Sequence, residues 1–343
     1  MSLKRIDNPP HAFNDVQMEW IDAPPAADLE IYEEHARTIL SENDSPDLGF
    51  RFSLNPYRGC FHACAYCYAR PTHQYWDFGA GTDFERKIVV KVNAPEKLRE
   101  AFMKRSWSGE MVVFSGNTDC YQPLEASYRL TRGCLEVCRD FRNPVGIITK
   151  SAIVRRDVEV LAELARVARA HVYFSVAFSD DKMARLIEPG APSPGTRLAA
   201  MKALADAGIP VGVSLAPVIP GLNDTQIAEI LERAYECGAR HAFRVMLRLP
   251  AEVKPVFLQR LEQAYPGRAQ KVINAVREMR GGALYNSQFH TRGKGSGQRW
   301  DAIEWLFELT CKKLGMNVTK ERDLHPNPPE PTFQRPGERT LFD

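Results

Sequence analysis

From about residue 50 to residue 250, short apolar runs alternate with segments whose apolar residues recur at the helical period. The candidate strands cover residues 51–55, 110–115, 145–149, 171–177, 211–216 and 242–247. The candidate helices between them cover residues 94–104, 124–141, 157–170, 195–207 and 225–238. Repeated strand–helix units give parallel strands joined by right-handed crossovers. About six such units predict an α/β fold, a partial (β/α)6 TIM-like barrel rather than a closed eight-stranded one.

The segments on either side of this region have a different character. Residues 1–48 are predicted to be an N-terminal arm with one helix over residues 28–41, and residues 49–250 form the partial barrel. Residues 251–321 are predicted to be a helical extension with helices over 255–265, 270–279 and 300–314. Residues 322–343 hold five prolines and mostly polar residues, so we expect a disordered tail.

The composition constrains the cellular location of the protein more than its function. Lysine and arginine together number 45 against 43 aspartates and glutamates, a net charge of +2 that neither demands nor excludes a nucleic acid partner. We recognise no secretory signal and no apolar run near the ~20 residues of a membrane span, so no membrane association is expected. Eight cysteines, three of them clustered, do not resemble a secreted disulfide framework. Free thiolates need a reducing compartment, which favours the cytoplasm.

The cysteine cluster carries the strongest chemical signal. Cys60, Cys64 and Cys67 follow a C-x3-C-x2-C spacing and supply three thiolates, one fewer than a [4Fe–4S] cluster uses. One iron would then be open to an exchangeable ligand. Two alternatives stay open, a zinc site with His62 as a fourth ligand and three unrelated thiols.

Residues 55–70, with Tyr66 just before the last cysteine, resemble the signature loop of the radical S-adenosylmethionine (SAM) enzymes. The resemblance implies that SAM chelates the open iron and that an external electron donor reduces the cluster. The reduced cluster then splits SAM into a 5′-deoxyadenosyl radical, which abstracts a hydrogen atom from the substrate. Tyr66 would lie near the adenine. The partial barrel predicted above is also the fold of this superfamily.

Further motifs resemble the spore photoproduct lyase branch of the superfamily, namely residues 115–125, 149–151 and 185–197 leading into 208–224. The resemblance implies that Thr118 and Asp119 accept hydrogen bonds from the SAM ammonium group. Lys150 would bind the SAM carboxylate and Ser175 would contact the ribose. The alternatives are a turn or a helix cap at residues 118–119, a solvated surface lysine and a strand serine bonded to backbone.

One position departs from the branch. The lyases carry a cysteine three residues before the aspartate, where it returns a hydrogen atom to the product radical, and this chain has Gly116 there. Cys120 is the nearest thiol and is a candidate catalytic donor, or else a small buried residue. Cys134 and Cys138, four apart on a candidate helix, are expected to pack rather than to bind a second metal. Glu188 and Arg197 are expected to pair across a loop rather than to contact substrate.

Two segments indicate partners. The glycine-rich loop over residues 281–297 lies among basic residues and two aromatic residues that suit phosphates and bases, unless it simply closes the barrel. These residues are Arg280, Tyr285, Phe289, His290, Arg292, Lys294 and Arg299. Leu341 and Phe342 resemble, imperfectly, the peptide that docks on the bacterial sliding clamp, which prefers glutamine where Glu338 stands.

These observations predict a radical SAM enzyme that acts on a nucleic acid, at a damaged or modified base. Two alternatives remain from the sequence. One is radical modification of a small molecule or peptide inside the same barrel, and the other is a non-catalytic iron–sulfur or metal-binding adaptor in DNA replication or repair.

Overall fold

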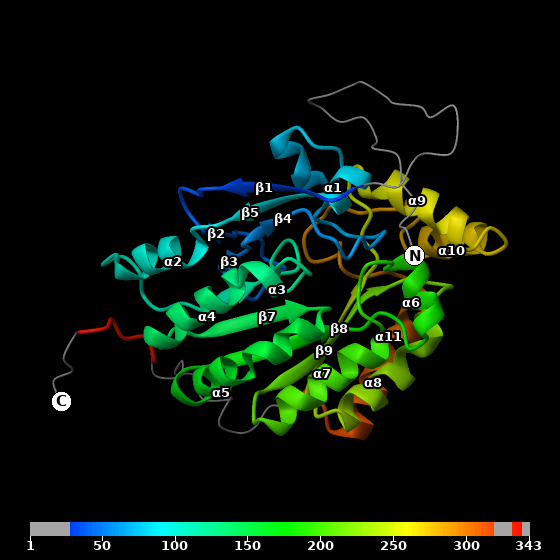
Figure 1. The fold of residues 1–343 in the computed structure, drawn as a ribbon. Helices are drawn as coiled ribbons and strands as arrows, with labels where there is room; N and C mark the ends of the chain where they lie inside the picture. The colour runs from blue at the N-terminus through cyan, green and yellow to red at the C-terminus, as the bar shows by residue number, and fades with distance from the viewer. Residues whose placement is uncertain (1–27, 319–330, 338–343) are drawn as a thin grey trace.

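The computed structural model describes residues 28–318 and 331–337 (Figure 1). Its main sheet has seven strands in the order β10-β9-β8-β7-β6-β3-β2. Their bounds are β2 Leu40–Glu42, β3 Phe52–Leu54, β6 Val112–Phe114, β7 Val145–Thr149, β8 Ala170–Ser175, β9 Val211–Val218 and β10 His241–Met246. The six strands from β3 to β10 are parallel, and β2 adds an antiparallel edge. The two edges do not pair within the described residues, so the predicted partial (β/α)6 barrel is confirmed.

The connecting helices follow one another along the sheet, as α4, α5 and α7 show in Figure 1. Buried residues of the main sheet and of these helices form one continuous core. The predicted helix over 124–141 is two helices, because Arg129 between them has a φ of 53° and breaks the helical path. The helices of this region are α2 Ala94–Met103, α3 Glu125–Tyr128, α4 Leu130–Asp140, α5 Val158–Val167, α6 Asp181–Ile187, α7 Pro194–Asp206 and α8 Ile227–Glu236.

A second, three-stranded sheet has the order β1-β5-β4, with β1 at Glu30–Glu34, β5 at Lys87–Lys91 and β4 at Tyr57–Arg58. The predicted helix over residues 28–41 is wrong, because this stretch contains β1 and the start of β2. Its backbone is satisfied instead by parallel pairing with β5, and this tertiary pairing overrides the local helix propensity.

The three predicted C-terminal helices are confirmed as α9 Val253–Ala264, α10 Ala269–Glu278 and α11 Gln298–Leu314, and α11 packs against α8. None of the helices in the described residues is long and apolar enough to cross a lipid bilayer.

The prediction of a disordered tail is wrong for residues 331–337. The Phe333 ring packs against Phe102 and Phe141, and the Gln334 N–H donates to the Phe141 carbonyl at 2.9 Å. Leu341 and Phe342 lie outside the described residues.

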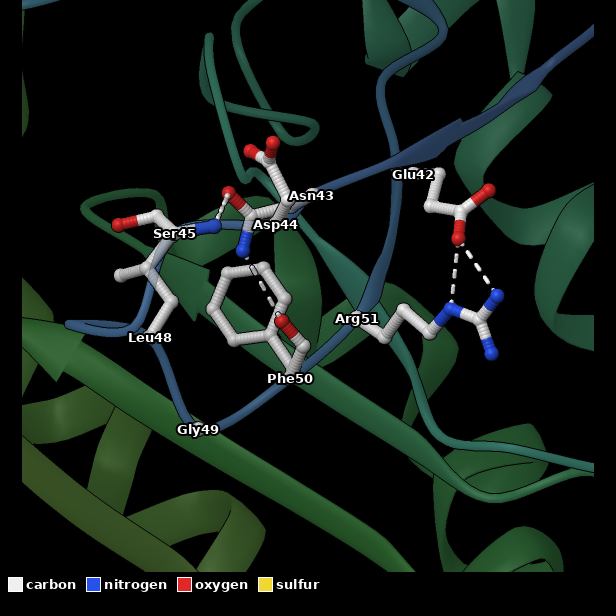
Figure 2. Close-up of a pocket in the computed structure, with 8 residues that line it drawn as sticks. All are labelled: Glu42, Asn43, Asp44, Ser45, Leu48, Gly49, Phe50 and Arg51. Carbon is white, nitrogen blue, oxygen red and sulfur yellow. Dashed lines mark hydrogen bonds and ion pairs between the residues drawn. The ribbon is translucent and has the colours of Figure 1, made fainter.

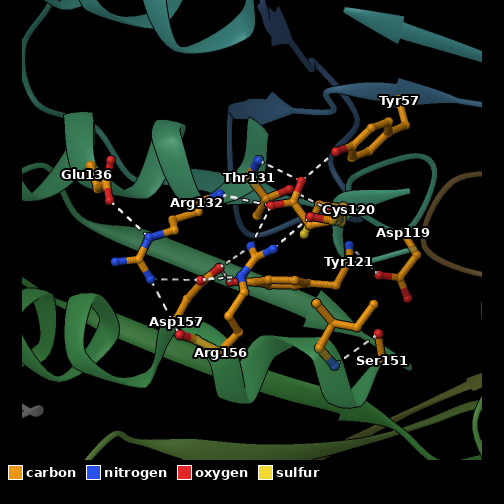
Figure 3. Close-up of polar contacts among 12 residues, drawn as sticks. Tyr57, Asp119, Cys120, Tyr121, Thr131, Arg132, Glu136, Ser151, Arg156 and Asp157 are labelled. Carbon is orange, nitrogen blue, oxygen red and sulfur yellow. Dashed lines mark hydrogen bonds and ion pairs between the residues drawn. The ribbon is translucent and has the colours of Figure 1, made fainter. Parts of the chain in front are cut away.

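A buried charge network holds α3 and α4 to the turn that follows β7 (Figure 3). The Arg156 guanidinium lies 2.7 Å from a Glu125 oxygen and 2.8 Å from an Asp157 oxygen. Arg132 binds Asp157 from α4 at 3.1 Å, and the Tyr57 hydroxyl donates to Glu125 at 2.5 Å. Since Tyr57 belongs to β4, this network also fixes the strand from which the cysteine loop leaves.

Candidate functional site

The three clustered cysteines lie in one loop directly after β4. Cys60 and Cys64 are buried and Cys67 is half-buried. Two tight turns shape the loop, since the Ala63 N–H donates to the Cys60 carbonyl and the Cys67 N–H to the Cys64 carbonyl, both at 3.2 Å. Ala63 takes a φ of 55°, which reverses the chain between the first two cysteines. The loop therefore gathers three thiols without any regular secondary structure.

The surroundings of the thiols suit a bound metal centre. Burial, together with the charges of Glu188 and Cys67, raises the pKa of Cys64 to about 12 although the charges of Lys150 and Arg197 oppose the rise. A bound metal would therefore be needed to keep this group a thiolate. No three histidine, cysteine, aspartate or glutamate side chains of the described residues surround one ion position. In a [4Fe–4S] cluster each cysteine binds its own iron, so no such convergence is required. His62 faces Asp119, with Nδ1 3.3 Å from Oδ2.

Arg70 anchors the loop from its C-terminal end and is fully buried. Nε and Nη2 donate to the Cys64 carbonyl at 3.2 and 2.8 Å, and Nη1 donates to the carbonyls of Ala80 and Gly81. Nη2 also binds Glu85 of α1 (Thr82–Arg86) at 2.5 Å. All five N–H donors of a guanidinium are thus used. The cysteine motif ends on this arginine, but nothing in the sequence indicates its partners.

The segment after α6 closes over the other side of the loop. The Gly190 N–H donates to the His62 carbonyl at 3.0 Å, and the Ala65 N–H donates to the Ile187 carbonyl at 2.9 Å. A Cβ at position 190 would lie 2.0 Å from the Phe61 carbonyl oxygen, so this close approach requires glycine. The Pro/Gly-rich composition of this segment is the sequence signal that pointed to it.

Asp119 joins the ends of β6 and β7. Its carboxylate accepts hydrogen bonds from the Thr149 hydroxyl at 2.7 Å and from the Lys150 N–H at 2.8 Å. Burial opposes ionisation, but His62 and these donors lower the pKa of Asp119 to about 2. The Thr118 hydroxyl donates to the Tyr57 carbonyl at 2.5 Å. Asp119 Oδ1 also accepts the Tyr121 N–H at 3.0 Å, which is a turn contact. Both side chains therefore have structural partners, and a role toward SAM stays a prediction.

The remaining predicted SAM contacts come together beside Cys64. The Tyr66 hydroxyl donates to Glu188, which forms a fully buried ion pair with Arg197. Arg197 in turn donates to the Ser175 carbonyl at 2.9 Å. The Lys150 ammonium lies 5.6 Å from the centre of the Tyr66 ring. The expected pairing of Glu188 with Arg197 is confirmed.

The candidate hydrogen donor packs next to α4, where its backbone carbonyl accepts the Thr131 hydroxyl at 2.6 Å. Cys120 has no exposed surface, and Figure 3 shows it beside Thr131 and Tyr121 while the Asp119 side chain extends elsewhere. This placement favours the packing alternative for Cys120. Cys134 and Cys138 are also fully buried on α4, as expected of packing residues.

The basic segment between α10 and α11 bridges the two edges of the main sheet. Its Gly293 carbonyl accepts the Met246 N–H of β10 at 2.9 Å. Its Arg292 side chain binds Asp47 in the connection from β2 to β3, and the His290 N–H donates to the same carboxylate at 2.5 Å. These contacts support the closing alternative. The side chains of Phe289 and Lys294 remain exposed.

The same connection forms a pocket of about 470 Å³ (Figure 2). All of its lining comes from residues 42–51, so it is the hollow of one turn between neighbouring strands. None of the cysteines or predicted SAM contacts lines it.

A family model described as the radical SAM superfamily matches residues 54–234, from the end of β3 into α8. The chain belongs to the radical SAM superfamily. An uncharacterized protein of Mycobacterium tuberculosis is 36% identical over 249 residues, which are 72% of this chain and 73% of the relative. An uncharacterized protein of Methanocaldococcus jannaschii is 29% identical over 58% of this chain and 71% of its own. A Pseudomonas phage M6 protein named radical SAM Nα-GlyT isomerase is 24% identical over 79% of this chain and 55% of its own.

Among solved structures, spore photoproduct lyase complexed with dinucleoside spore photoproduct aligns with a TM-score of 0.58 at 17% identity, over 83% of this chain and 80% of the lyase. The likeness confirms the expected fold. As a radical SAM enzyme, the chain uses a [4Fe–4S] cluster and SAM, and a lyase structure of the same fold contains bound SAM. The loop of three cysteines is the part of this chain that fits the cluster.

Proposed function

We propose that this radical SAM enzyme modifies or repairs a base in a nucleic acid. When bound, the cluster and SAM supply a 5′-deoxyadenosyl radical for hydrogen abstraction. The observation that carries the substrate class is Tyr68, which directly follows Cys67 and is 48% exposed. Its hydroxyl donates to the Gly116 carbonyl at 2.9 Å, and the Arg248 guanidinium lies 5.9 Å from its ring centre. An oriented, exposed ring with a cation beside it suits stacking on a base and attraction of a phosphate.

The comparisons support the same substrate class. The lyase with this fold is described in complex with a dinucleoside lesion. The exposed Phe289 and Lys294 on the bridging segment add a second aromatic residue and a second cation. Within the site, we propose that Asp119, Thr118, Lys150 and Ser175 hold SAM and that Tyr66 packs near its adenine.

The test is anaerobic reconstitution with iron and sulfide, followed by dithionite, SAM and oligonucleotides. We expect more 5′-deoxyadenosine with ultraviolet-irradiated DNA than with undamaged DNA, and none from the Cys64→Ala variant. Retained cleavage in Cys64→Ala would remove that residue from the ligand set. Formation of 5′-deoxyadenosine only with small molecules or peptides would favour the alternative substrate class. An intact cluster with no cleavage under any condition would favour the adaptor.

An oligonucleotide-binding assay tests the role of Tyr68 separately from the radical reaction. Fluorescence anisotropy with a labelled oligonucleotide should show several-fold weaker binding for Tyr68→Leu, since base stacking contributes ~1–3 kcal/mol. Tyr75→Leu is the matched control, because Tyr75 is 78% exposed but does not adjoin a cysteine. Equal losses in the two variants would contradict the assignment.

We further propose a cytoplasmic setting, an external electron donor and docking of Leu341 and Phe342 on a sliding clamp. All eight cysteines are free, which suits a reducing compartment. A direct binding assay between the clamp and the full chain, compared with a Leu341→Ala, Phe342→Ala double variant, tests the docking. Equal binding of the two proteins would dismiss it.

A further inference from the structure

Two charge clusters flank the cysteine loop, and one of them has two cations for a single anion. The first consists of Arg70, Arg260 and Glu85, and all three side chains are nearly or fully buried. The second contains two cations, Lys150 and Arg197, and two anions, Glu188 and Asp119. Excess positive charge therefore lies on the side of the loop that Arg70 and Arg260 occupy.

The first cluster shares one carboxylate between two guanidinium groups. Arg70 Nη2 lies 2.5 Å from Glu85 Oε1, and Arg260 Nη2 lies 3.3 Å from the same oxygen and 3.4 Å from Oε2. The Arg260 side chain is only 8% exposed, and its Nε has no acceptor among the described residues. A buried guanidinium without a full counter-charge is unfavourable. Its environment is therefore suited to a further negative group.

The cysteine loop is where that negative group would be. Arg70 reaches it directly through the Cys64 carbonyl. A [4Fe–4S] cluster held by three thiolates is anionic, and it becomes more negative when it accepts an electron. A nearby uncompensated cation stabilises the reduced state more than the oxidised state, because attraction grows with the charge of the cluster.

We propose that Arg260, acting through the carboxylate it shares with Arg70, raises the reduction potential of the cluster bound by the cysteine loop. Arg260 comes from α9, outside residues 54–234 that the family model matches. It is a positioning residue, since its contact with the loop runs through Glu85 and Arg70. The inference rests on the radical SAM family and does not depend on the nucleic acid substrate.

The test is a redox titration of the reconstituted enzyme, monitored by electron paramagnetic resonance without substrate, with iron content measured on each sample. Arg260→Met removes the charge and should lower the midpoint potential. Arg260→Lys keeps the charge and should stay close to the parent protein. Glu85→Gln removes the shared anion and should shift the potential upward. Arg244→Met is the control, because Arg244 is a partly buried arginine of β10 that is paired with Glu304 of α11.

Shifts of opposite sign for Arg260→Met and Glu85→Gln, with Arg244→Met unchanged, would support the proposal. If only one of the two variants retains the cluster, a lower potential in Arg260→Met or a higher potential in Glu85→Gln would support the proposal, and the opposite shift would overturn it. Unchanged potentials at full iron content would overturn the proposal, and so would shifts of the same sign. Loss of the cluster from both variants would also overturn it, because the residues would then serve only to support the loop.

Discussion

Arg70 holds the backbone carbonyl of Cys64 with two of its own N–H groups, at 3.2 Å from Nε and 2.8 Å from Nη2. We predict that Arg70→Lys lowers the iron bound after reconstitution and lowers the free energy of unfolding by about 3–5 kcal/mol, because an ammonium cannot reproduce a five-donor fork and leaves Glu85 poorly paired. Urea unfolding of the apoprotein and iron analysis measure the two effects.

Arg139→Lys provides the comparison for this substitution. Arg139 is about one-third exposed and pairs with Asp140 on the surface of α4. We expect it to change neither quantity measurably, since surface pairs contribute little. Full iron content in Arg70→Lys would show that the loop holds its shape without the arginine.

Cys120 provides a test of where the hydrogen atom returned to substrate comes from. Because Cys120 is fully buried beside α4, Cys120→Ala should leave 5′-deoxyadenosine formation intact and cost about 1 kcal/mol of stability through lost packing. Chromatography of the nucleoside and of the substrate product separates the two outcomes. Normal cleavage with loss of substrate turnover would instead establish Cys120 as the donor.

Gly116 shows why the usual donor cysteine does not fit here. A Cβ at this position would lie 2.7 Å from the Cβ of Ser53 in β3. We predict that Gly116→Cys destabilises the protein by about 1–3 kcal/mol through overpacking. Adding Ser53→Gly should recover part of that loss, which a double-mutant cycle by urea unfolding would reveal. Strictly additive effects would mean that the two positions do not collide.

Much of the fold could be predicted because its strands are continuous apolar runs. Val145–Thr149 and Val211–Val218 are mostly buried and read directly as strands of a parallel sheet. The small second sheet could not be recognised in the same way. Its β1, Glu30–Glu34, is largely exposed and acidic, and β4 has only two residues. Only β5, with three consecutive β-branched residues, carries a readable strand signal.

The candidate site, like the fold, could be predicted only in part from the sequence. Lys150 and Ser175 could be placed together, because the carboxyl ends of the parallel strands β7 and β8 converge on one face of a barrel. The contact of Glu85 with Arg260 joins residues 175 positions apart and matches no local pattern. The charge that surrounds the cysteines therefore becomes visible only in the folded chain.

His73 should make stability depend on pH. Its side chain is 1% exposed, and burial lowers its pKa to about 4. The unfolded chain takes up a proton near pH 6.5 while the folded chain does not, so the stabilisation is complete above pH 6.5 and is lost as the pH falls toward 4. This difference in the pKa of His73 between the unfolded and folded chains corresponds to about 3 kcal/mol of unfolding free energy.

Urea unfolding of the apoprotein at pH 7 and pH 4.5 measures this dependence. His73→Phe should reduce the difference in unfolding free energy between the two pH values, whereas His290→Asn, at an exposed position, should leave that difference unchanged. If His73→Phe loses as much stability between pH 7 and pH 4.5 as the parent protein does, other groups cause the acid sensitivity.

Phe333 should anchor the C-terminal segment to the barrel. Its ring stacks on Phe141 at a centroid distance of 6.0 Å and meets Phe102 edge-on at 5.9 Å, and Arg335 beside it donates to the Trp107 carbonyl at 3.1 Å. Because Phe333 is half-buried, Phe333→Ala should cost less than a full core deletion, about 1–3 kcal/mol. Thr332→Ala, which loses one exposed hydrogen bond to the Arg142 carbonyl, is the nearby control and should cost about 1 kcal/mol or less. Urea unfolding measures both, and limited proteolysis should cut the Phe333→Ala chain faster within residues 331–337. Equal stability and equal cleavage in the two variants would mean that the segment does not contribute to the fold.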